Sequence, residues 1–259
     1  MDAPALKLSN LTIGYAGGGS KHQVAEDMNA SLYAGELVSL VGSNGAGKST
    51  LLRTISAFQP PLSGQIFYGD RCEPAVAASQ LSRILAIVLT GREPIYNISV
   101  REVVAMGRMP YTGFWGGNSE HDSRVVDEAM EMMGIAALAD RSVETLSDGE
   151  RQKTMIAKAL AQQTPIILLD EPTAFLDFKS RVHLMQTLRT LAHDARKAVL
   201  LSTHDLELAL QLSDSLWVMH KGTMQTGSVE QLSSSGALSA FIDGDGMHYD
   251  AIAKKITII

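Results

Sequence analysis

The residues with the most evident chemistry form a glycine-rich run that ends in a lysine and two hydroxyl residues. Its members are Gly42, Ser43, Asn44, Gly45, Ala46, Gly47, Lys48, Ser49 and Thr50. The run matches the G-x-x-x-x-G-K-[ST] pattern, whose glycines let the backbone curl so that successive N–H groups converge on an anion. It lies between an expected strand and an expected helix, whose positive N-terminal end adds to the attraction. The spacing predicts a nucleotide phosphate site rather than a chance turn, with Lys48 on the β- and γ-phosphates and the Ser49 hydroxyl on Mg²⁺.

Two carboxylates follow an apolar run at residues 166–169. Asp170 and Glu171 should lie at the carboxyl edge of a sheet, where ligands of open α/β sheets bind. Carboxylate oxygen suits Mg²⁺, so Asp170 is a candidate metal ligand, acting through water. Glu171 points elsewhere and is a candidate general base for an attacking water. Alone, the pair fits an acidic helix cap equally well, but beside a phosphate loop the catalytic interpretation is favoured.

His204 follows the next apolar run, residues 198–202, at the same expected edge. A histidine there can hydrogen-bond a γ-phosphate or the attacking water. By itself the residue would better fit a helix start, with Asp205 and Glu207 as capping residues. Its position beside the other motifs makes it a candidate catalytic residue, together with Lys48 and Glu171.

A second possible anion site opens the helix expected after Leu146. Ser147 and Glu150 match the S-x-x-E capping box, with Asp148 and Gly149 between them. A capped helix start that contains glycine also offers hydroxyl and N–H donors to an anion. Because this helix belongs to an inserted lobe, it need not face the phosphate loop of its own chain.

The elements that must position these residues alternate between strands and helices. Patterns typical of strands occur at residues 6–15, 36–41, 64–68, 84–89, 166–170, 198–202 and 215–220, and helices are expected at 48–57 and 178–193. In the middle third, helical spacing occurs at residues 99–107, 119–133 and 149–162. We expect one α/β domain over residues 1–259, a P-loop NTPase core with an inserted α-helical lobe and N-terminal antiparallel β strands. The core would take residues 1–90 and 163–235, the lobe 91–162, and a C-terminal tail 236–259.

Composition limits the alternatives. The 259 residues are 45% hydrophobic, and their formal net charge of -6, without a basic stripe, argues against a nucleic-acid partner. The one cysteine, Cys72, excludes an intramolecular disulfide and a cysteine-cluster metal site. The sequence has no signal-peptide pattern and no apolar run near the ~20 residues of a membrane helix. A role at a membrane would therefore require docking on an embedded partner.

Together these motifs resemble those of the ATP-binding-cassette (ABC) ATPases. The matching motifs, in order, are Tyr15, the phosphate loop at residues 42–50, the signature at residues 146–150, Asp170 with Glu171, residues 174–177, and His204. The resemblance implies the ABC ATPase fold and a head-to-tail dimer that binds ATP between the phosphate loop of one chain and Ser147, Asp148 and Gly149 of the other. It further implies that Tyr15 stacks on adenine, Asp177 crosses the dimer interface, Glu171 acts as general base and His204 holds the γ-phosphate.

The sequence departs from the family pattern at two places. Asp148 replaces the commonest glycine of the signature and Glu150 its frequent glutamine, so a carboxylate lies near a phosphate-binding turn and should point away from it. The apolar run at residues 84–89 should be followed by a glutamine that contacts Mg²⁺, but Thr90, Gly91 and Arg92 occupy that place. We hypothesise that the Thr90 hydroxyl fills this role with a shorter reach.

Residues 100–115 resemble the importer branch that serves iron-siderophore, haem and cobalamin. That branch implies a homodimer docked on a separate polytopic membrane permease, at the cytoplasmic face of the inner (plasma) membrane, with an external substrate-binding protein as an indirect partner. An aromatic loop with Tyr111, Phe114 and Trp115 could serve this docking or pack within the lobe.

Two other functions fit the sequence less well. A non-transport ABC ATPase acting on ribosomes or DNA would usually carry two cassettes or a long coiled coil and basic surfaces, whereas this sequence has one cassette, no sustained heptads and an acidic balance. A P-loop kinase or GTPase would leave the signature unexplained, and no Asn-Lys-x-Asp motif is found. The importer interpretation is favoured, and its cargo cannot be read from the sequence.

Overall fold

The computed structural model of the chain describes residues 3–17, 20–73, 76–91, 96–112, 119–244 and 246–258. Its strands are β1 (Leu6–Gly17), β2 (Ser20–Leu32), β3 (Leu37–Gly42), β4 (Ser63–Tyr68), β5 (Arg71–Cys72), β6 (Leu85–Val88), β7 (Ile166–Leu169), β8 (Ala198–Ser202), β9 (Ser215–His220), β10 (Thr223–Gly227), β11 (Met247–Asp250) and β12 (Lys255–Ile258). Its α-helices are α1 (Lys48–Ile55), α2 (Ala78–Ile84), α3 (Val100–Ala105), α4 (Glu120–Met132), α5 (Asp148–Ala161), α6 (Phe178–Asp194), α7 (Leu206–Leu212), α8 (Val229–Ser234) and α9 (Ala237–Ile242).

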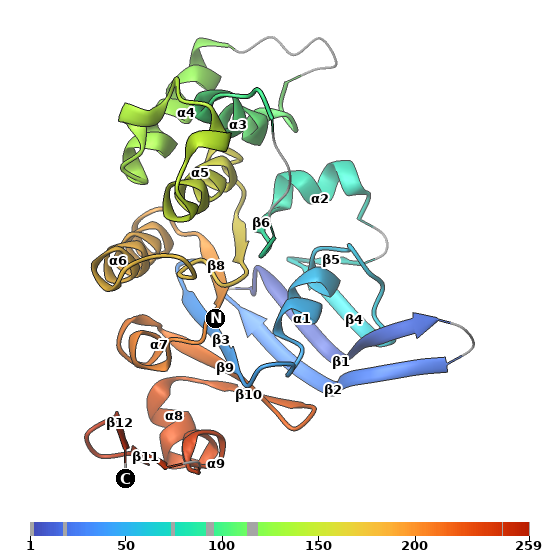
Figure 1. Ribbon diagram of the computed structural model, residues 1–259. Helices are drawn as coiled ribbons and strands as arrows, with labels where there is room; N and C mark the ends of the chain where they lie inside the picture. Colours follow the sequence, from blue (N-terminus) through green and yellow to red (C-terminus); the bar gives the residue numbers. More distant parts are fainter. Residues whose placement is uncertain are drawn as a thin grey trace.

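A six-stranded sheet lies at the centre of the molecule, in the order β10-β9-β3-β8-β7-β6 (Figure 1). All neighbouring strands run parallel except β10, which pairs antiparallel with β9. Because side chains alternate between the faces of a strand, Ile166 and Leu168 of β7 join one buried cluster and Ile167 and Leu169 join the other. Both faces are covered, which explains the continuous apolar runs in the sequence.

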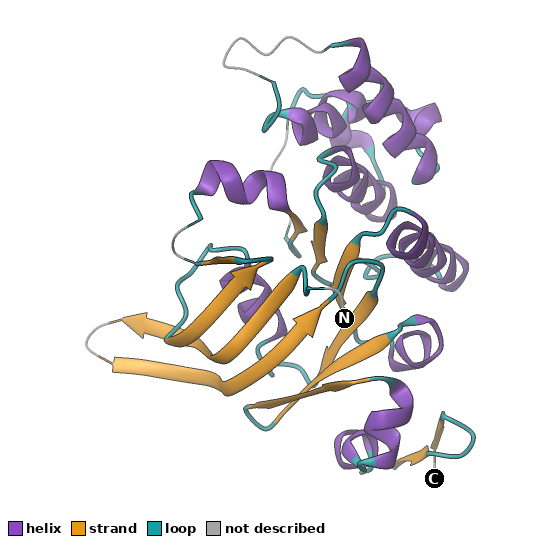
Figure 2. Cartoon of the chain, turned by 180° about the vertical axis from the view of Figure 1, so that it is seen from behind, coloured by secondary structure: helices purple, strands orange, loops and turns teal. Residues whose placement is uncertain are grey.

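A second sheet contains four antiparallel strands in the order β2-β1-β4-β5. Its apolar side chains share a buried cluster with α1 and with one face of the central sheet. Figure 2 shows the long β1–β2 pair extending away from the helices. The predicted N-terminal antiparallel strands are thus confirmed, although β2 was not recognised individually because its sequence is largely polar.

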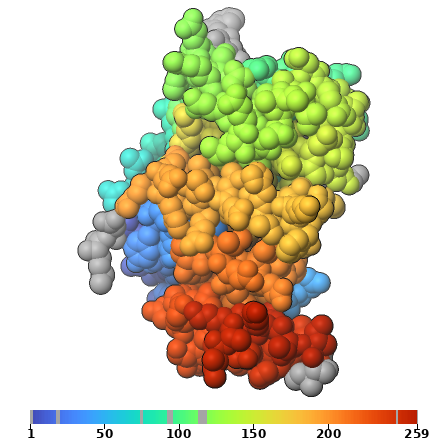
Figure 3. Space-filling view, turned by 90° about the vertical axis from the view of Figure 1, so that its left-hand side faces the viewer, coloured from blue at the N-terminus to red at the C-terminus, as the bar shows by residue number. Residues whose placement is uncertain are grey.

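Three helices, α3, α4 and α5, form a lobe that covers one end of the molecule (Figure 3). They confirm the helical segments predicted for the middle third, with α3 continuing into the 3-10 helix η1 (Met106–Arg108). The buried Arg108 joins them: its Nε donates to Asp122 Oδ1 at 2.8 Å, and its Nη1 donates to the Ala161 carbonyl at 2.8 Å. Apolar side chains of all three helices belong to the cluster on the other face of the central sheet.

The C-terminal residues have more structure than the expected tail. Helices α8 and α9 and the β11–β12 hairpin enclose a third buried cluster, in which Tyr249 is 1% exposed and hydrogen-bonds Ser233 Oγ at 2.7 Å. These elements are only four to six residues long, too short for periodicity to reveal them in the sequence. Within the described ranges, no helix combines the length and apolar character needed to cross a membrane.

Candidate active site

The phosphate loop joins β3 to α1, as predicted. Gly47 precedes the helix with a left-handed φ of 102°, and a Cβ at this position would lie 2.4 Å from Val24 Cγ1. At Gly42 a Cβ would lie 2.7 Å from the Met219 carbonyl oxygen of the neighbouring strand β9. Gly47 is favoured by its backbone conformation and by the limited space, whereas Gly42 is favoured by the limited space alone. The loop therefore keeps its curled backbone close to the sheet edge.

Lys48 is the first residue of α1, and only 6% of it is exposed. Its Nζ donates to the carbonyl oxygens of Gly42 at 2.8 Å and Ser43 at 3.3 Å, so the ammonium lies across its own loop. Burial lowers the pKa of Lys48, and the nearby carboxylates of Glu171 and Asp170 oppose that effect. A cation held this way is positioned for the negative charge of a polyphosphate.

The Asp170 carboxylate accepts hydrogen bonds from hydroxyl groups of three separate segments of the chain. Ser202 Oγ at the end of β8 donates to its Oδ1 at 2.7 Å, Ser49 Oγ of α1 donates to the same oxygen at 3.2 Å, and Thr90 Oγ1, beyond β6, donates to Oδ2 at 2.8 Å. Asp170 itself is only 1% exposed. The structure thus places Thr90 beside Ser49 and Asp170, the two other residues predicted to hold Mg²⁺.

These groups suit a hard cation. Carboxylate and hydroxyl oxygens are the ligands that Mg²⁺ prefers, and Mg²⁺ usually takes one or two carboxylates while keeping water or phosphate ligands. The structure contains no cluster of three or more His, Cys, Asp or Glu side chains able to hold a metal in the portions that it describes. One carboxylate with neighbouring hydroxyl groups leaves coordination positions for phosphate and water, so these donors fit a cation shared with a nucleotide.

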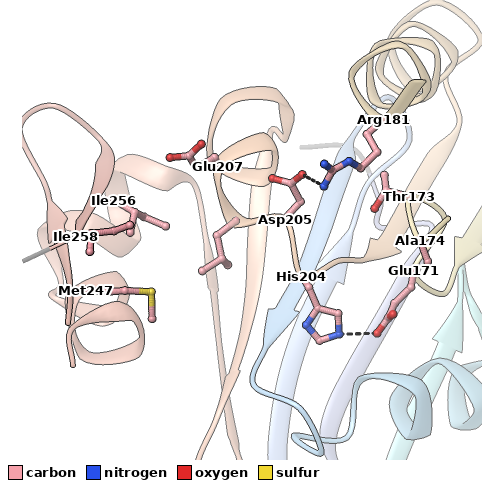
Figure 4. A pocket seen from close by; sticks show the side chains of 11 residues that line it. Glu171, Thr173, Ala174, Arg181, His204, Asp205, Glu207, Met247, Ile256 and Ile258 are labelled. Atoms are coloured by element: carbon pink, nitrogen blue, oxygen red, sulfur yellow. Dashed lines mark hydrogen bonds and ion pairs between the residues drawn. The ribbon is translucent and has the colours of Figure 1, made fainter. Parts of the chain in front are cut away.

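Glu171 and His204 lie next to this cluster and contact each other (Figure 4). His204 Nε2 and Glu171 Oε1 are 2.6 Å apart. Glu171 adopts a positive φ of 49°, and its N–H donates to Ser202 Oγ at 2.9 Å. The side chains of Asp170 and Glu171 thus take different partners, so the two adjacent carboxylates can serve different purposes.

Tyr15 lies near the start of α1. It is 51% exposed, and its hydroxyl is 2.8 Å from Thr50 Oγ1. This contact brings the end of β1 beside the phosphate loop. The exposed part of the ring is available for stacking.

The signature residues lie at the start of α5, where the predicted capping box is confirmed. Ser147 Oγ accepts from the Glu150 N–H at 3.3 Å, and the Glu150 carboxylate accepts from the Ser147 N–H at 2.9 Å. These hydrogen bonds hold the pKa of Glu150 below its usual value. Asp148 is exposed and lines a cavity with Thr90 and Arg151, whereas the phosphate loop lines a different one.

Asp177 caps the start of α6, accepting from the Ser180 N–H at 3.0 Å and from Ser180 Oγ at 2.9 Å. These bonds lower the pKa of Asp177. Just before it, Phe175 has a positive φ of 66° and is 67% exposed. Phe175 thus presents an exposed ring from a backbone conformation that residues other than glycine rarely adopt.

The structure adds residues that sequence reasoning missed. Ser202 Oγ donates to Asp170 and accepts from the Glu171 N–H. Its position as a hydroxyl residue at the end of an apolar strand was the sequence feature that could have identified it. Arg181 pairs with Asp205 beside a cavity of about 540 Å³ that Glu171 and His204 also line. Arg181 has no sequence signal of its own, because it reaches Asp205 only through the tertiary fold.

Part of the predicted aromatic loop can be placed. The guanidinium groups of Arg108 and Arg83 lie 4.4 Å and 5.6 Å from the centre of the Tyr111 ring, while 40% of Tyr111 remains exposed. Phe114 and Trp115 lie outside the described residues, and so does Arg92.

Comparisons with known proteins agree with this geometry. The family model described as ABC transporter matches residues 25–174. The iron(3+)-hydroxamate import ATP-binding protein of Bacillus subtilis is 33% identical over 220 residues, which cover 85% of this chain and 80% of that protein. The cobalamin import ATP-binding protein of Halobacterium salinarum is 40% identical over 200 residues, covering 77% of this chain but only 50% of that longer protein.

Solved structures agree as well. A bacterial ABC transporter cassette, determined as a dimer, superposes with a TM-score of 0.77 at 27% identity, covering 86% of this chain and 98% of that one. The matched family segment contains the phosphate loop, the signature and the Asp170–Glu171 pair. This chain belongs to the ABC transporter family and is one of its ATP-binding, ATP-hydrolysing cassettes.

Proposed function

We propose that this chain is the ATPase subunit of an importer for iron-siderophore, haem or cobalamin. The proposal is supported by the resemblance of residues 100–115 and by relatives named for the import of iron(3+)-hydroxamate and cobalamin. In it, two copies act on a separate polytopic permease at the cytoplasmic face of the plasma membrane. An external substrate-binding protein is an indirect partner, and nucleic acid is not a partner.

The main support for the proposed mechanism is that Asp170 accepts hydrogen bonds from Ser49, Thr90 and Ser202. In the proposed site, Ser49, Thr90 and Asp170 hold Mg²⁺, with Asp170 acting through water. When bound, the cation would neutralise charge on the phosphates. Thr90 would replace the family's glutamine, since its hydroxyl already reaches the same carboxylate as Ser49.

The rest of the loop, residues 42–50, would surround the phosphates with backbone N–H groups while Lys48 contacts the β- and γ-phosphates. Glu171 would take a proton from the attacking water, and His204 would hold both Glu171 and the γ-phosphate. The 2.6 Å contact between His204 and Glu171 supports this pairing, because it orients the base before substrate arrives.

A second copy would complete each site. We propose that Ser147, Asp148, Gly149 and Glu150 of one chain close over the ATP bound by the other, with Asp177 at the interface and Tyr15 stacked on adenine. The exposed Phe175 beside Asp177 supports an interface there. Residues 91–162 would form the lobe that carries the signature.

The test uses the full chain with Glu171→Gln, purified from detergent-solubilised membranes in the presence of MgATP. We expect this variant to form dimers and to co-purify with a polytopic membrane protein, and we expect that protein to stimulate ATP hydrolysis by the unmodified chain. Co-purification with ribosomes or DNA instead would support the non-transport alternative and contradict the importer. Monomers at saturating MgATP would contradict the dimeric site.

A further inference from the structure

An ion pair links the helix that follows Glu171 to the residue that follows His204. Arg181 lies in the first turn of α6, and its Nη1 donates to Asp205 Oδ2 at 2.9 Å. Figure 4 shows this pair above the contact between His204 and Glu171. The pair belongs to none of the motifs that bind nucleotide in the proposed function.

Asp205 fixes the backbone on both sides of His204. Its Oδ1 accepts from the Leu208 N–H at 3.2 Å and so caps α7, while its own N–H donates to Thr203 Oγ1 at 3.0 Å. The short segment around His204 is thereby held to the start of a helix. With Oδ1 engaged in the cap, Oδ2 is the oxygen that meets Arg181.

These contacts form a closed ring. The Glu171 N–H is held by Ser202 at the end of β8, and the Glu171 side chain meets His204. From Glu171 the chain runs to α6, and Arg181 returns from α6 to Asp205, next to His204. If the ion pair between Arg181 and Asp205 were broken, His204 would still contact Glu171, but α6 would no longer hold the segment around His204.

The ion pair is incomplete. Arg181 Nε is buried yet has no hydrogen-bond partner among the residues that the structure describes, so the guanidinium contacts Asp205 through one nitrogen. A bidentate contact would satisfy Nε as well. The two side chains are 35% and 18% exposed, and with Nε unsatisfied in the described part of the chain the pair lacks the bidentate geometry of the strongest ion pairs. Its geometric effect on His204 therefore matters more than its effect on folding.

We propose that Arg181 and Asp205 are positioning residues that hold His204 in contact with Glu171 during hydrolysis. This inference rests on the catalytic roles of Glu171 and His204 in the proposed function. Neither Arg181 nor Asp205 needs to touch ATP. Breaking the pair misplaces His204 and slows turnover without weakening nucleotide binding.

The experiment measures steady-state ATP hydrolysis by the full chain carrying Arg181→Ala or Asp205→Ser, the latter keeping a good N-cap residue while removing the charge. We expect kcat to fall about 10-fold in each, with KM for ATP changed less than about twofold, since a small misplacement of a catalytic group lowers the rate. The double variant should be no slower than either single one, and Arg181→Lys should recover part of the rate. Arg189→Ala, at an exposed position on the same helix, is the matched control and should keep the original rate.

A second measurement separates positioning from a structural role. In a His204→Ala background, Arg181→Ala should lower kcat no further, because the pair acts through the missing ring. The inference is overturned if Arg181→Ala and Asp205→Ser turn over as fast as Arg189→Ala, or if Arg181→Ala still costs about 10-fold without His204. Normal turnover in Glu171→Gln and His204→Ala would overturn the proposed site as a whole. Strongly reduced but measurable turnover in both, beside fully active variants of Arg181 and Asp205, would overturn the role of the ion pair alone.

Discussion

The two helix starts that could bind an anion differ in what satisfies their donors. Helix α1 begins after Gly47, which has no side chain to accept from its first N–H groups, and Lys48 adds a positive charge. Helix α5 begins after its N-cap residue Ser147, whose hydroxyl and the Glu150 carboxylate accept from donors within the same turn. Asp148 and Glu150 also place negative charge there.

The difference indicates two kinds of site. The first N–H groups of α1 need an acceptor from outside the helix, and a phosphate can supply it, so α1 should bind nucleotide on its own. Helix α5 is stable without a ligand, and its acidic first turn weakens attraction for an anion. We expect α5 to contribute only when a second copy places it against nucleotide already bound.

The largest expected effect comes from the base beside the α1 site. Glu171→Gln should keep ATP binding, lower kcat by about 10³-fold and trap a dimer, because the amide cannot take a proton from water. Single-turnover hydrolysis and size-exclusion chromatography with MgATP measure the two consequences. If the variant stayed monomeric and fully active, neither Glu171 as the base nor the dimer would be required for hydrolysis.

Lys48→Ala tests whether α1 binds nucleotide by itself. Loss of a buried cation from a phosphate site should raise the Kd for ATP by about 100-fold, since a buried charged contact is lost. Equilibrium binding to a fluorescent ATP analogue measures this. Unchanged affinity would mean that the start of α1 is not the principal phosphate site.

Thr90→Ala tests the departure from the family's glutamine. A hydrogen bond to a charged group contributes about 1.5–3 kcal/mol, so its loss should raise the Mg²⁺ concentration for half-maximal hydrolysis about 10-fold. Titration of ATPase activity with Mg²⁺ measures this effect, and Thr90→Ser should restore most of it. If Thr90→Ala left rate, Mg²⁺ dependence and transport coupling unchanged, the role of Thr90 would be refuted.

Ser147→Ala sharpens the comparison at α5, with Ser228→Ala as a matched control in the capping box of α8. Both substitutions should cost about 1 kcal/mol of stability through the lost cap. Only Ser147→Ala should also lower ATP hydrolysis, by several-fold, because only this hydroxyl would meet nucleotide in the dimer. Thermal melting and ATPase assays distinguish the two effects, and equal activities would assign Ser147 a purely structural role.

The smallest effect concerns the stability of the lobe that carries α5. The hydrogen bond from Ser119 and the Arg108 guanidinium lower the pKa of Asp122 from 3.8 to about 2. The ionised Asp122 carboxylate therefore stabilises the folded protein fully above pH 3.8. This contribution to the free energy of unfolding is lost as the pH falls towards 2. Thermal melting from pH 5 downwards should decline more steeply for the unmodified chain than for Asp122→Asn, and parallel curves would contradict the assignment.

Sequence patterns predicted the phosphate loop, the capping box and the buried strands, because these features depend on residue types within a few positions of each other. The glycines, Lys48 and the capping box at Ser147 act over a few neighbouring residues, and the apolar runs of β7 and β8 follow from burial on both faces of a sheet. The largely polar β2 and the short C-terminal elements were not recognised, because their conformation depends on strand pairing and on contacts such as Tyr249 with Ser233. For those segments, local pattern is too weak to predict the element.

By itself, the sequence determined which groups the chain offers to a nucleotide, since glycine-rich turns, caps and paired carboxylates depend on residue type and short spacing. Only the tertiary structure decided which of those groups meet. Thr90, Ser49 and Ser202 come from distant parts of the chain, yet all three bond Asp170. The physical reason is the parallel order of the sheet, which brings the carboxyl ends of β6, β7 and β8 to one edge.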